Sequence, residues 1–170
     1  GGTYAAITPL VSPGTVTEAL GNTSSSPKTV VYTFTVSRAG CASVSTSTSV
    51  VVDPTPVFTG TPYTGTICSG AALGFTATSD VGGSTFSWTS TPVANITGNS
   101  AVGSGTIVDV LVNTGNAVET VTYVLTVTGP GPESCVNAAT SNYVVTINPS
   151  PVQTITNNDA TGIAQNIDMV

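Results

Sequence analysis

Residues 119–151 read ETVTYVLTVTGPGPESCVNAATSNYVVTINPSP, and this stretch decides the fold. Apolar residues alternate with polar ones at its start, and a second alternating run ends at a Pro-Ser-Pro sequence. Strict alternation is typical of a half-buried β-strand, because successive side chains point to opposite faces of a sheet. The stretch therefore predicts strands over residues 121–127 and 142–147, joined by a loop and followed by a proline linker.

The same pattern occurs earlier, as KTVVYTFTVSRAGCASVSTSTSVVVDPTP at residues 28–56. Tyr123 corresponds to Tyr32, and further upstream Asn113 corresponds to Asn22. The offset is 113 − 22 = 91 before the first strand and 149 − 54 = 95 at the linker, since the second loop is slightly longer. A period of this size is that of a whole domain rather than of a solenoid repeat. The chain is therefore predicted to be a tandem array.

This repeat divides the 170 residues into three parts. Residues 1–54 are predicted to be the closing half of one β-sandwich unit, residues 55–150 a complete unit, and residues 151–170 a linker and the start of a following unit. The half unit lacks opening strands, which would leave a sheet edge and half a core uncovered. We expect Gly1 to be either an arbitrary start within a longer protein or a point at which a partner chain supplies those strands.

Short alternating runs, separated by turns about every 8 to 12 residues, predict an all-β fold. About seven such runs in the complete unit, with no helical periodicity, indicate a two-sheet sandwich of immunoglobulin-like type. The predicted strands cover residues 15–20, 30–36 and 45–52 in the half unit, and 64–68, 72–78, 85–90, 93–96, 106–112, 121–127 and 142–147 in the complete unit. The residues predicted to fill the core are Phe75, Phe86, Trp88, Tyr123, Leu125 and Val127, with Tyr32 and Phe34 in the half unit.

The composition excludes several classes of function. Only 6% of residues are charged, and the net charge is −6. Nucleic-acid binding is excluded because no basic patch can displace counterions from a phosphate backbone. No apolar run is long enough to predict a membrane-spanning helix.

No constellation of residues points to catalysis. Histidine is absent, so neither a Ser-His pair nor a histidine-ligated metal site can form. The eight carboxylates are scattered and make no D-x-D-x-D run. Asp53 beside the linker is a candidate calcium ligand, but a solvated carboxylate is the favoured interpretation. We therefore predict a protein that is not an enzyme and has no metal or cofactor.

The three cysteines follow the repeat. The complete unit carries Cys68 near its start and Cys135 near its end, whereas the half unit keeps only the late one, Cys41. Parity suggests one disulfide in each unit, Cys68 to Cys135, and with it an oxidising extracellular setting. Three unpaired cysteines that act as small buried hydrophobes are the alternative, and the sequence leaves both open.

Aromatic residues raise the question of a sugar-binding platform. Phe86 and Trp88 share one face of a predicted strand, which favours a place in the core over a stacking surface. Tyr63 lies in a glycine-rich loop and is the aromatic residue expected to be exposed.

The segments TICSGAALGFTATS, STFSWTST, GSGTIVDVLVNTG, TVTYVLTVTG and YVVTINPSP together resemble the PKD-like repeats of very large bacterial surface proteins. Similar repeats occur in gliding-motility adhesins of Bacteroidota that the type IX pathway exports. The resemblance covers nearly all of residues 14–152. Trp88 is followed by Thr-Ser-Thr instead of the Asp-Phe-Gly-Asp-Gly turn of the better-known PKD domain, so no role tied to that turn is carried over.

The resemblance implies a repeated spacer in a long extracellular, cell-surface adhesin or filament, active in surface adhesion or gliding motility. Its partners would be neighbouring repeats of the same chain, with the secretion machinery during export. Two alternatives stay open: a module that binds polysaccharide or other cell-surface proteins, and a filament subunit that donates strands to its neighbour.

Overall fold

A computed structural model of the chain describes residues 2–3 and 15–152. The described residues form thirteen β-strands and no helix, so the fold is all-β, as the sequence predicts. Residues 153–170, predicted to begin a following unit, lie outside the described residues. The strands are β1 (Gly2–Thr3), β2 (Gly21–Asn22), β3 (Lys28–Val36), β4 (Val44–Val52), β5 (Phe58–Thr59), β6 (Tyr63–Cys68), β7 (Thr78–Ser79), β8 (Thr85–Ser90), β9 (Ile96–Thr97), β10 (Val102–Ser104), β11 (Val112–Asn113), β12 (Glu119–Thr128) and β13 (Ser141–Asn148).

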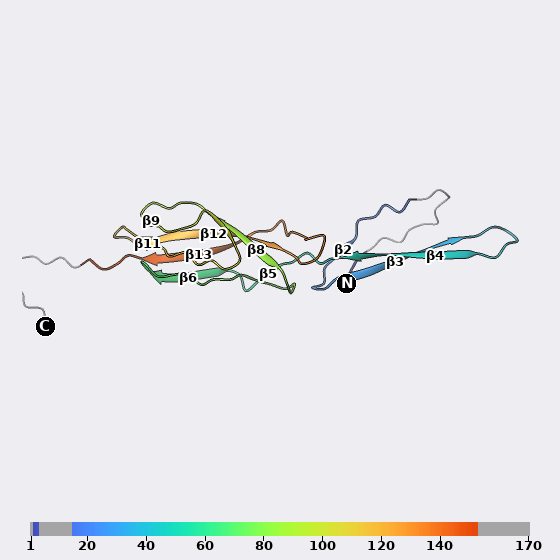
Figure 1. Cartoon of the computed structure of the whole chain (residues 1–170), viewed down its shortest axis with the longest axis horizontal. Coiled ribbons are helices and arrows are strands. Elements are labelled where there is room, and N and C mark those ends of the chain that lie inside the picture. Colours follow the sequence, from blue (N-terminus) through green and yellow to red (C-terminus); the bar gives the residue numbers. More distant parts are fainter. Residues whose placement is uncertain (1, 4–14, 153–170) are drawn as a thin grey trace, which may run out of the picture.

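One layer of the complete unit is a five-stranded sheet in the order β10-β8-β12-β13-β6. The central strand β12 pairs antiparallel with β8 on one side and with β13 on the other. At the edge, β6 pairs parallel with β13, so the first long strand of the unit lies beside its last (Figure 1). This pairing puts the end of β6 next to the end of β13, where the chain leaves the unit.

The opposite layer is less regular than the sequence predicts. The expected strands over residues 72–78 and 106–112 are present only as a short antiparallel ladder with isolated bridges. Leu73 N donates to Asp109 O over 2.8 Å, and Phe75 and Ile107 exchange bonds of 3.2 and 2.8 Å. The short pairs β5–β7 and β9–β11 form separate two-stranded sheets. The predicted strand over residues 15–20 is not formed.

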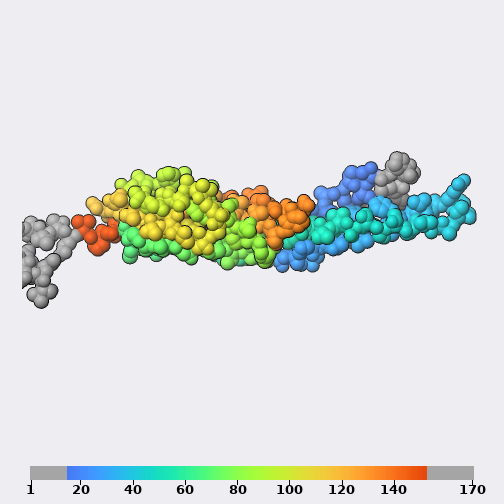
Figure 2. Space-filling model, viewed as in Figure 1, coloured from blue at the N-terminus to red at the C-terminus, as the bar shows by residue number. Residues whose placement is uncertain are grey.

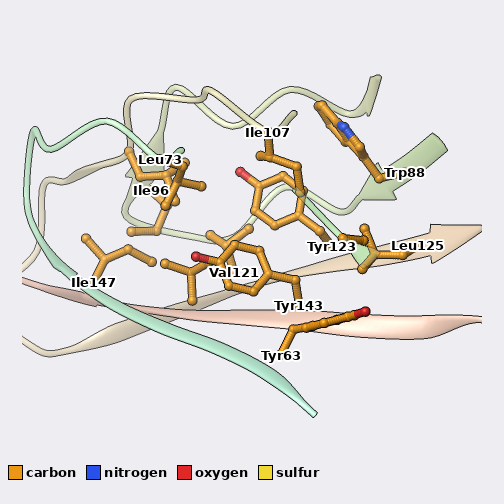
Figure 3. Packing of buried hydrophobic residues seen from close by; sticks show 13 residues of the cluster. Tyr63, Leu73, Trp88, Ile96, Ile107, Val121, Tyr123, Leu125, Tyr143 and Ile147 are labelled. Carbon is orange, nitrogen blue, oxygen red and sulfur yellow. The ribbon is translucent and has the colours of Figure 1, made fainter. Parts of the chain in front are cut away.

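A core of thirteen buried residues, all between Tyr63 and Ile147, lies between the two layers (Figure 3). Tyr123 is fully buried, and its ring meets the Trp88 indole edge to face at 5.3 Å. Leu125 and Val127 are also buried, while Phe75 and Phe86 are partly buried against the rest. The complete unit therefore closes its own hydrophobic core.

The strands of the first unit pair in the same register as their counterparts in the complete unit. Tyr32 pairs with Thr48 in the β3–β4 hairpin, as Tyr123 pairs with Tyr143 between β12 and β13. The short pair β1–β2 likewise repeats β9–β11, since the partner of Asn22 is Gly2 and the partner of Asn113 is Ile96. The described part of the first unit thus begins at the counterpart of β9.

The prediction that Tyr32 and Phe34 lie in a core is wrong for this chain. Tyr32 is only partly buried, and the exposed fraction of Phe34 is 37%. The physical reason is that β3 and β4 form a two-stranded sheet, and the described residues include no counterparts of β6 and β8 beside it. The hairpin consequently projects from the complete unit as a bare ribbon (Figures 1 and 2).

Candidate functional site: the junction between repeat units

The four residues that join the hairpin to the complete unit, 53–56, make an extended linker. Pro54 and Pro56 are both buried, and Pro56 is among the least exposed residues of the chain. Proline fixes its own φ and biases the preceding residue toward extended geometry, so the Pro-Thr-Pro sequence has little freedom to bend. Buried prolines in a connecting segment show that another part of the chain covers it.

The covering segment is the loop between β12 and β13, residues 129–140, which we call the late loop. Asn137 Nδ2 donates a 2.8 Å hydrogen bond to Pro56 O. The backbone at Gly129 comes so close to the linker that an added Cβ would lie 3.4 Å from both Pro54 O and Pro56 Cδ. Figure 2 shows this loop, in orange, against the base of the hairpin. The complete unit therefore holds the linker that precedes it.

Asp53 and Asp80 add polar contacts at the two ends of this linker. Cys135 Sγ of the late loop lies 4.0 Å from Asp53 O. At the other end, Asp80 Oδ1 accepts a 2.7 Å bond from Val57 N, and Asp80 N donates to Val57 O. The linker is thus held at both ends by the unit that follows it.

The second linker, after β13, gives a direct comparison. Pro149 corresponds to Pro54 and Pro151 to Pro56, yet Pro149 is only partly buried and Pro151 is exposed. Residues 149–152 and Asn116 line an open hollow at this end of the unit. The prolines of a Pro-x-Pro linker are therefore buried where a late loop covers them, and more accessible at residues 149–151, against which the described residues place no late loop.

A buried asparagine anchors the strand that leads into each linker. Asn113 Nδ2 donates to Ile147 O, two residues before the linker, over 3.1 Å and to Ala117 O over 2.7 Å. Asn22 makes the same two bonds, to Val52 O over 2.8 Å and to Ser26 O over 2.9 Å. The sequence shows these asparagines as a repeated pair, but their role emerges only from the hydrogen bonds.

A carboxylate–tyrosine pair also recurs inside each unit. Tyr123 OH donates a 2.7 Å bond to Asp109 Oδ2, and Tyr32 OH donates to Glu18 at the same sequence separation. Asp109 in addition accepts bonds of 2.8 and 2.7 Å from Ser100 N and Oγ. Burial, followed by the bond to Asp109, raises the pKa of Tyr123 above its ordinary value. The pair fixes the central strand to the opposite layer.

The candidate disulfide between Cys68 and Cys135 is absent, because the structure places the two residues at opposite ends of the unit. All three cysteines are free thiols. Cys68 lies opposite Asn148 at the end of β13, whereas Cys135 precedes the start of that strand. The length of β13 alone separates them by roughly 20 Å, far beyond the reach of a disulfide.

The expectation that Tyr63 is exposed is also wrong. Its exposed fraction is 8%, and its hydroxyl donates to Thr59 O at 2.5 Å and to Thr78 O at 3.1 Å. Phe34 is the one aromatic residue among the exposed large hydrophobic residues that the structure describes. The described part of the chain holds no group of three or more acidic or cysteine side chains that could bind a metal ion.

Two matches to one family account for most of the sequence. The family model of the PKD-like domain matches residues 5–56 and 65–151. The chain belongs to the PKD-like domain family. A search of curated proteins found no match.

PKD-like domains are typically extracellular or surface modules that are structural or adhesive rather than catalytic. The all-β sandwich of the described residues fits that description. No helix of the described residues is long and apolar enough to cross a membrane. The chain is thus a PKD-like repeat module, and several of its polar contacts lie at the junction between units.

Proposed function

We propose that this chain is a stalk segment of a large extracellular adhesin or filament, in which PKD-like units follow one another end to end. The observation that carries the proposal is the burial of Pro54 and Pro56 by the late loop of the unit that follows them. A flexible tether between independent domains would instead be solvated, with its carbonyls bonded to water.

The contacts at the junction are suited to keeping successive units aligned. Pro56 O is held by Asn137, Val57 by Asp80, and Asp53 lies against the late loop. Each of these residues belongs to or touches the linker, so a hinge motion would break several contacts together. A chain of such junctions would have a nearly constant direction from unit to unit.

The adhesive and gliding roles rest on the resemblance to the repeats of bacterial gliding-motility adhesins. The composition supports an exposed fibre, because only 6% of residues are charged while serine and threonine cover the outer faces of the strands. On this proposal the partners of the segment are the neighbouring repeats, and the type IX pathway exports the protein to the cell surface. An antibody raised against residues 55–152 should label intact producing cells.

Small-angle X-ray scattering of the 170-residue chain tests the stalk. The expected particle is elongated, with the hairpin continuing the long axis of the complete unit. Asn137→Ala removes the bond to Pro56 O and should broaden the distribution of interatomic distances, because the junction then bends. Asn116→Ala is the matched control, since this exposed residue makes no hydrogen bond that the structure describes and lies at the other end of the unit. A compact wild-type particle, with the hairpin folded back on the unit, would refute the proposal.

A second candidate function, a filament subunit that exchanges strands, is favoured by the bare β3–β4 hairpin. Val36 and Val44 are 74% and 71% exposed, and Phe34 lies on the same face. In the complete unit the counterpart of this face is covered by the rest of the sandwich. Light scattering should then show that the 170-residue chain forms concentration-dependent oligomers. A monomer at all concentrations would contradict the exchange.

A further inference from the structure

The placement of the three cysteines points to a covalent bond between units in place of one within a unit. We infer that, at each junction of the array, the cysteine that ends β6 of one unit forms a disulfide with the late-loop cysteine of the next unit. The inference rests on the proposed tandem array. Cys135 would then be bonded to a cysteine of the preceding unit, and Cys68 to a cysteine of the following unit.

The argument starts from the register between β6 and β13. Cys68 pairs with Asn148, and the N–H of the following residue, Ser69, donates a 2.9 Å bond to Asn148 O. The repeat relates Asn148 to Asp53, because 148 − 95 = 53. In a completed first unit, the counterpart of Cys68 would therefore lie beside Asp53, at the ordinary spacing of about 5 Å between neighbouring strands.

Cys135 approaches the backbone of Asp53 from the other side of the junction. Its Sγ lies 4.0 Å from Asp53 O, the atom equivalent to the one that Ser69 N approaches in the complete unit. A cysteine beside Asp53 would thus lie next to the same carbonyl group as Cys135, within the short range over which two cysteines can be bonded.

The late loop holds Cys135 at this position. An added Cβ on Gly131 would lie 2.7 Å from Asp53 Oδ2, so the loop backbone packs closely against Asp53. Ser134 N donates to Gly131 O, and Asn137 is bonded to Pro56 O. Cys135 is partly buried there.

The same geometry accounts for the other two thiols. Cys68 is exposed at the downstream end, beside the uncovered linker that a following late loop would cover. Cys41 is the late-loop cysteine of the first unit and is exposed at the far tip of the hairpin. Each cysteine is therefore placed for a neighbouring unit, which explains why two cysteines in one unit do not meet.

The bond forms by thiol–disulfide exchange with a low-molecular-weight disulfide such as oxidised glutathione. One cysteine thiolate attacks that disulfide and displaces the first glutathione thiolate. The second cysteine thiolate then attacks the mixed disulfide and displaces the other. Two cysteine thiols are oxidised to one disulfide, and oxidised glutathione is reduced to two molecules of glutathione.

The test restores the missing strands of the first unit. Gly2 is the counterpart of Ile96, and 96 − 2 = 94, so a copy of residues 57–94 placed before Gly1 supplies the counterparts of β5 to β8. Cys68→Ala in the original unit removes the duplicate peptide and leaves three thiols: the grafted one, Cys41 and Cys135. The chain is treated with a mixture of oxidised and excess reduced glutathione, in which reduced glutathione returns the mixed disulfides of unpaired cysteines to free thiols. Alkylation and peptide mapping then identify the bonded pair.

The expected product links the grafted cysteine to Cys135 and leaves Cys41 alkylated. Adding Cys135→Ala should abolish the bond and leave both remaining thiols free. A bond between the grafted cysteine and Cys41, within one unit, would overturn the inference, and so would three free thiols in a folded chain.

A second variant needs no graft and keeps the inference falsifiable if the grafted chain does not fold. Asp53→Cys in the 170-residue chain places a thiol beside Cys135. The same glutathione mixture should join these two cysteines, while Cys41 and Cys68 stay free. If Cys135 stays free in this variant, or pairs with Cys68 in the unmodified chain, it is not directed at the linker and the inference falls.

Scattering from the grafted chain separates this inference from the proposed function. An elongated particle with free thiols would leave the stalk in place without its crosslinks. A folded-back particle that still carries the disulfide would refute the stalk instead.

Discussion

The replacement of Asn113 by alanine tests whether the buried asparagine holds the closing strand in place. Asn113 is 5% exposed, and its side chain makes three hydrogen bonds: to Ala117 O, to Ile147 O and from Gly115 N to its Oδ1 at 2.9 Å. At about 1 kcal/mol net for each bond, Asn113→Ala should lower the free energy of unfolding by about 3 kcal/mol. With a urea dependence of about 1.5 kcal/mol/M, the midpoint should fall by roughly 2 M.

The assay is equilibrium unfolding in urea, followed by the fluorescence of the single tryptophan, Trp88. This residue is in the core of the complete unit and reports on that unit alone. Asn22→Ala, which removes the equivalent bonds from the first unit, should therefore leave the Trp88 transition unchanged. Asn116→Ala is the exposed control, and its midpoint should equal that of the wild type.

Asn113→Asp distinguishes lost hydrogen bonds from lost packing. The aspartate keeps the size of the side chain, but it directs a carboxylate oxygen at the carbonyls of Ala117 and Ile147. At neutral pH it should destabilise the unit at least as much as alanine does. If Asn113→Ala changed the free energy of unfolding by less than about 0.5 kcal/mol, or if Asn113→Asp were neutral, the reasoning would be refuted.

Three further predictions concern the core of the complete unit. Asp109→Ala leaves the buried Tyr123 hydroxyl without its acceptor and should lower the free energy of unfolding by about 2 to 4 kcal/mol. Adding Tyr123→Phe to the same chain should recover part of this loss. A double-mutant cycle in urea that shows no coupling between the two residues would contradict the prediction. The pKa of Tyr123 is raised above its unfolded value of about 10. The contribution of this residue to stability is therefore complete below pH 10, and above pH 10 it falls by about 1.4 kcal/mol per pH unit. Absorbance at alkaline pH should show this phenol ionising only on unfolding, and Tyr123→Phe should reduce the loss of stability with rising pH. Gly103→Ala would place a Cβ 2.1 Å from Trp88 Cζ2, so it should cost about 1 to 3 kcal/mol and shift the tryptophan emission, whereas Gly74→Ala meets open space and should leave the emission unchanged.

The strands that the sequence predicts best are those with strict alternation. The predicted ranges 30–36, 121–127 and 142–147 agree with β3, β12 and β13 to within two residues at each end. In β12 and β13 the alternation has its usual cause, because one face of each strand is buried in the core and the other is not. In β3 the same pattern marks the strand correctly, although no residue of β3 is buried. The sequence predicts two full strands over residues 72–78 and 106–112, where the structure has a short ladder over residues 70–75 and 107–111. Within this ladder Asp109 points its carboxylate inward, to Ser100 and Tyr123.

The junction could be predicted only in part. The Pro-x-Pro sequences mark its place, and the repeated asparagines mark the strand ends that lead into it. Nothing in the local pattern indicates that Asn137 reaches Pro56 O across 81 positions of sequence, or that Asp80 holds Val57. A carboxylate recurring at the offset of 91, in Glu18 and Asp109, was the one available signal for the tyrosine pair.

The sequence by itself determined the all-β class, the domain-sized repeat and the positions of the closing strands, because alternation and period can be read along the chain itself. Only the tertiary structure decided which of the repeated residues are buried. Tyr123 is fully buried while its counterpart Tyr32 is only partly buried, since burial depends on strands that come from elsewhere in the chain. The same is true of Cys68 and Cys135: the parallel pairing of β6 with β13 sends them to opposite ends of the unit, and no count of cysteines could reveal that direction.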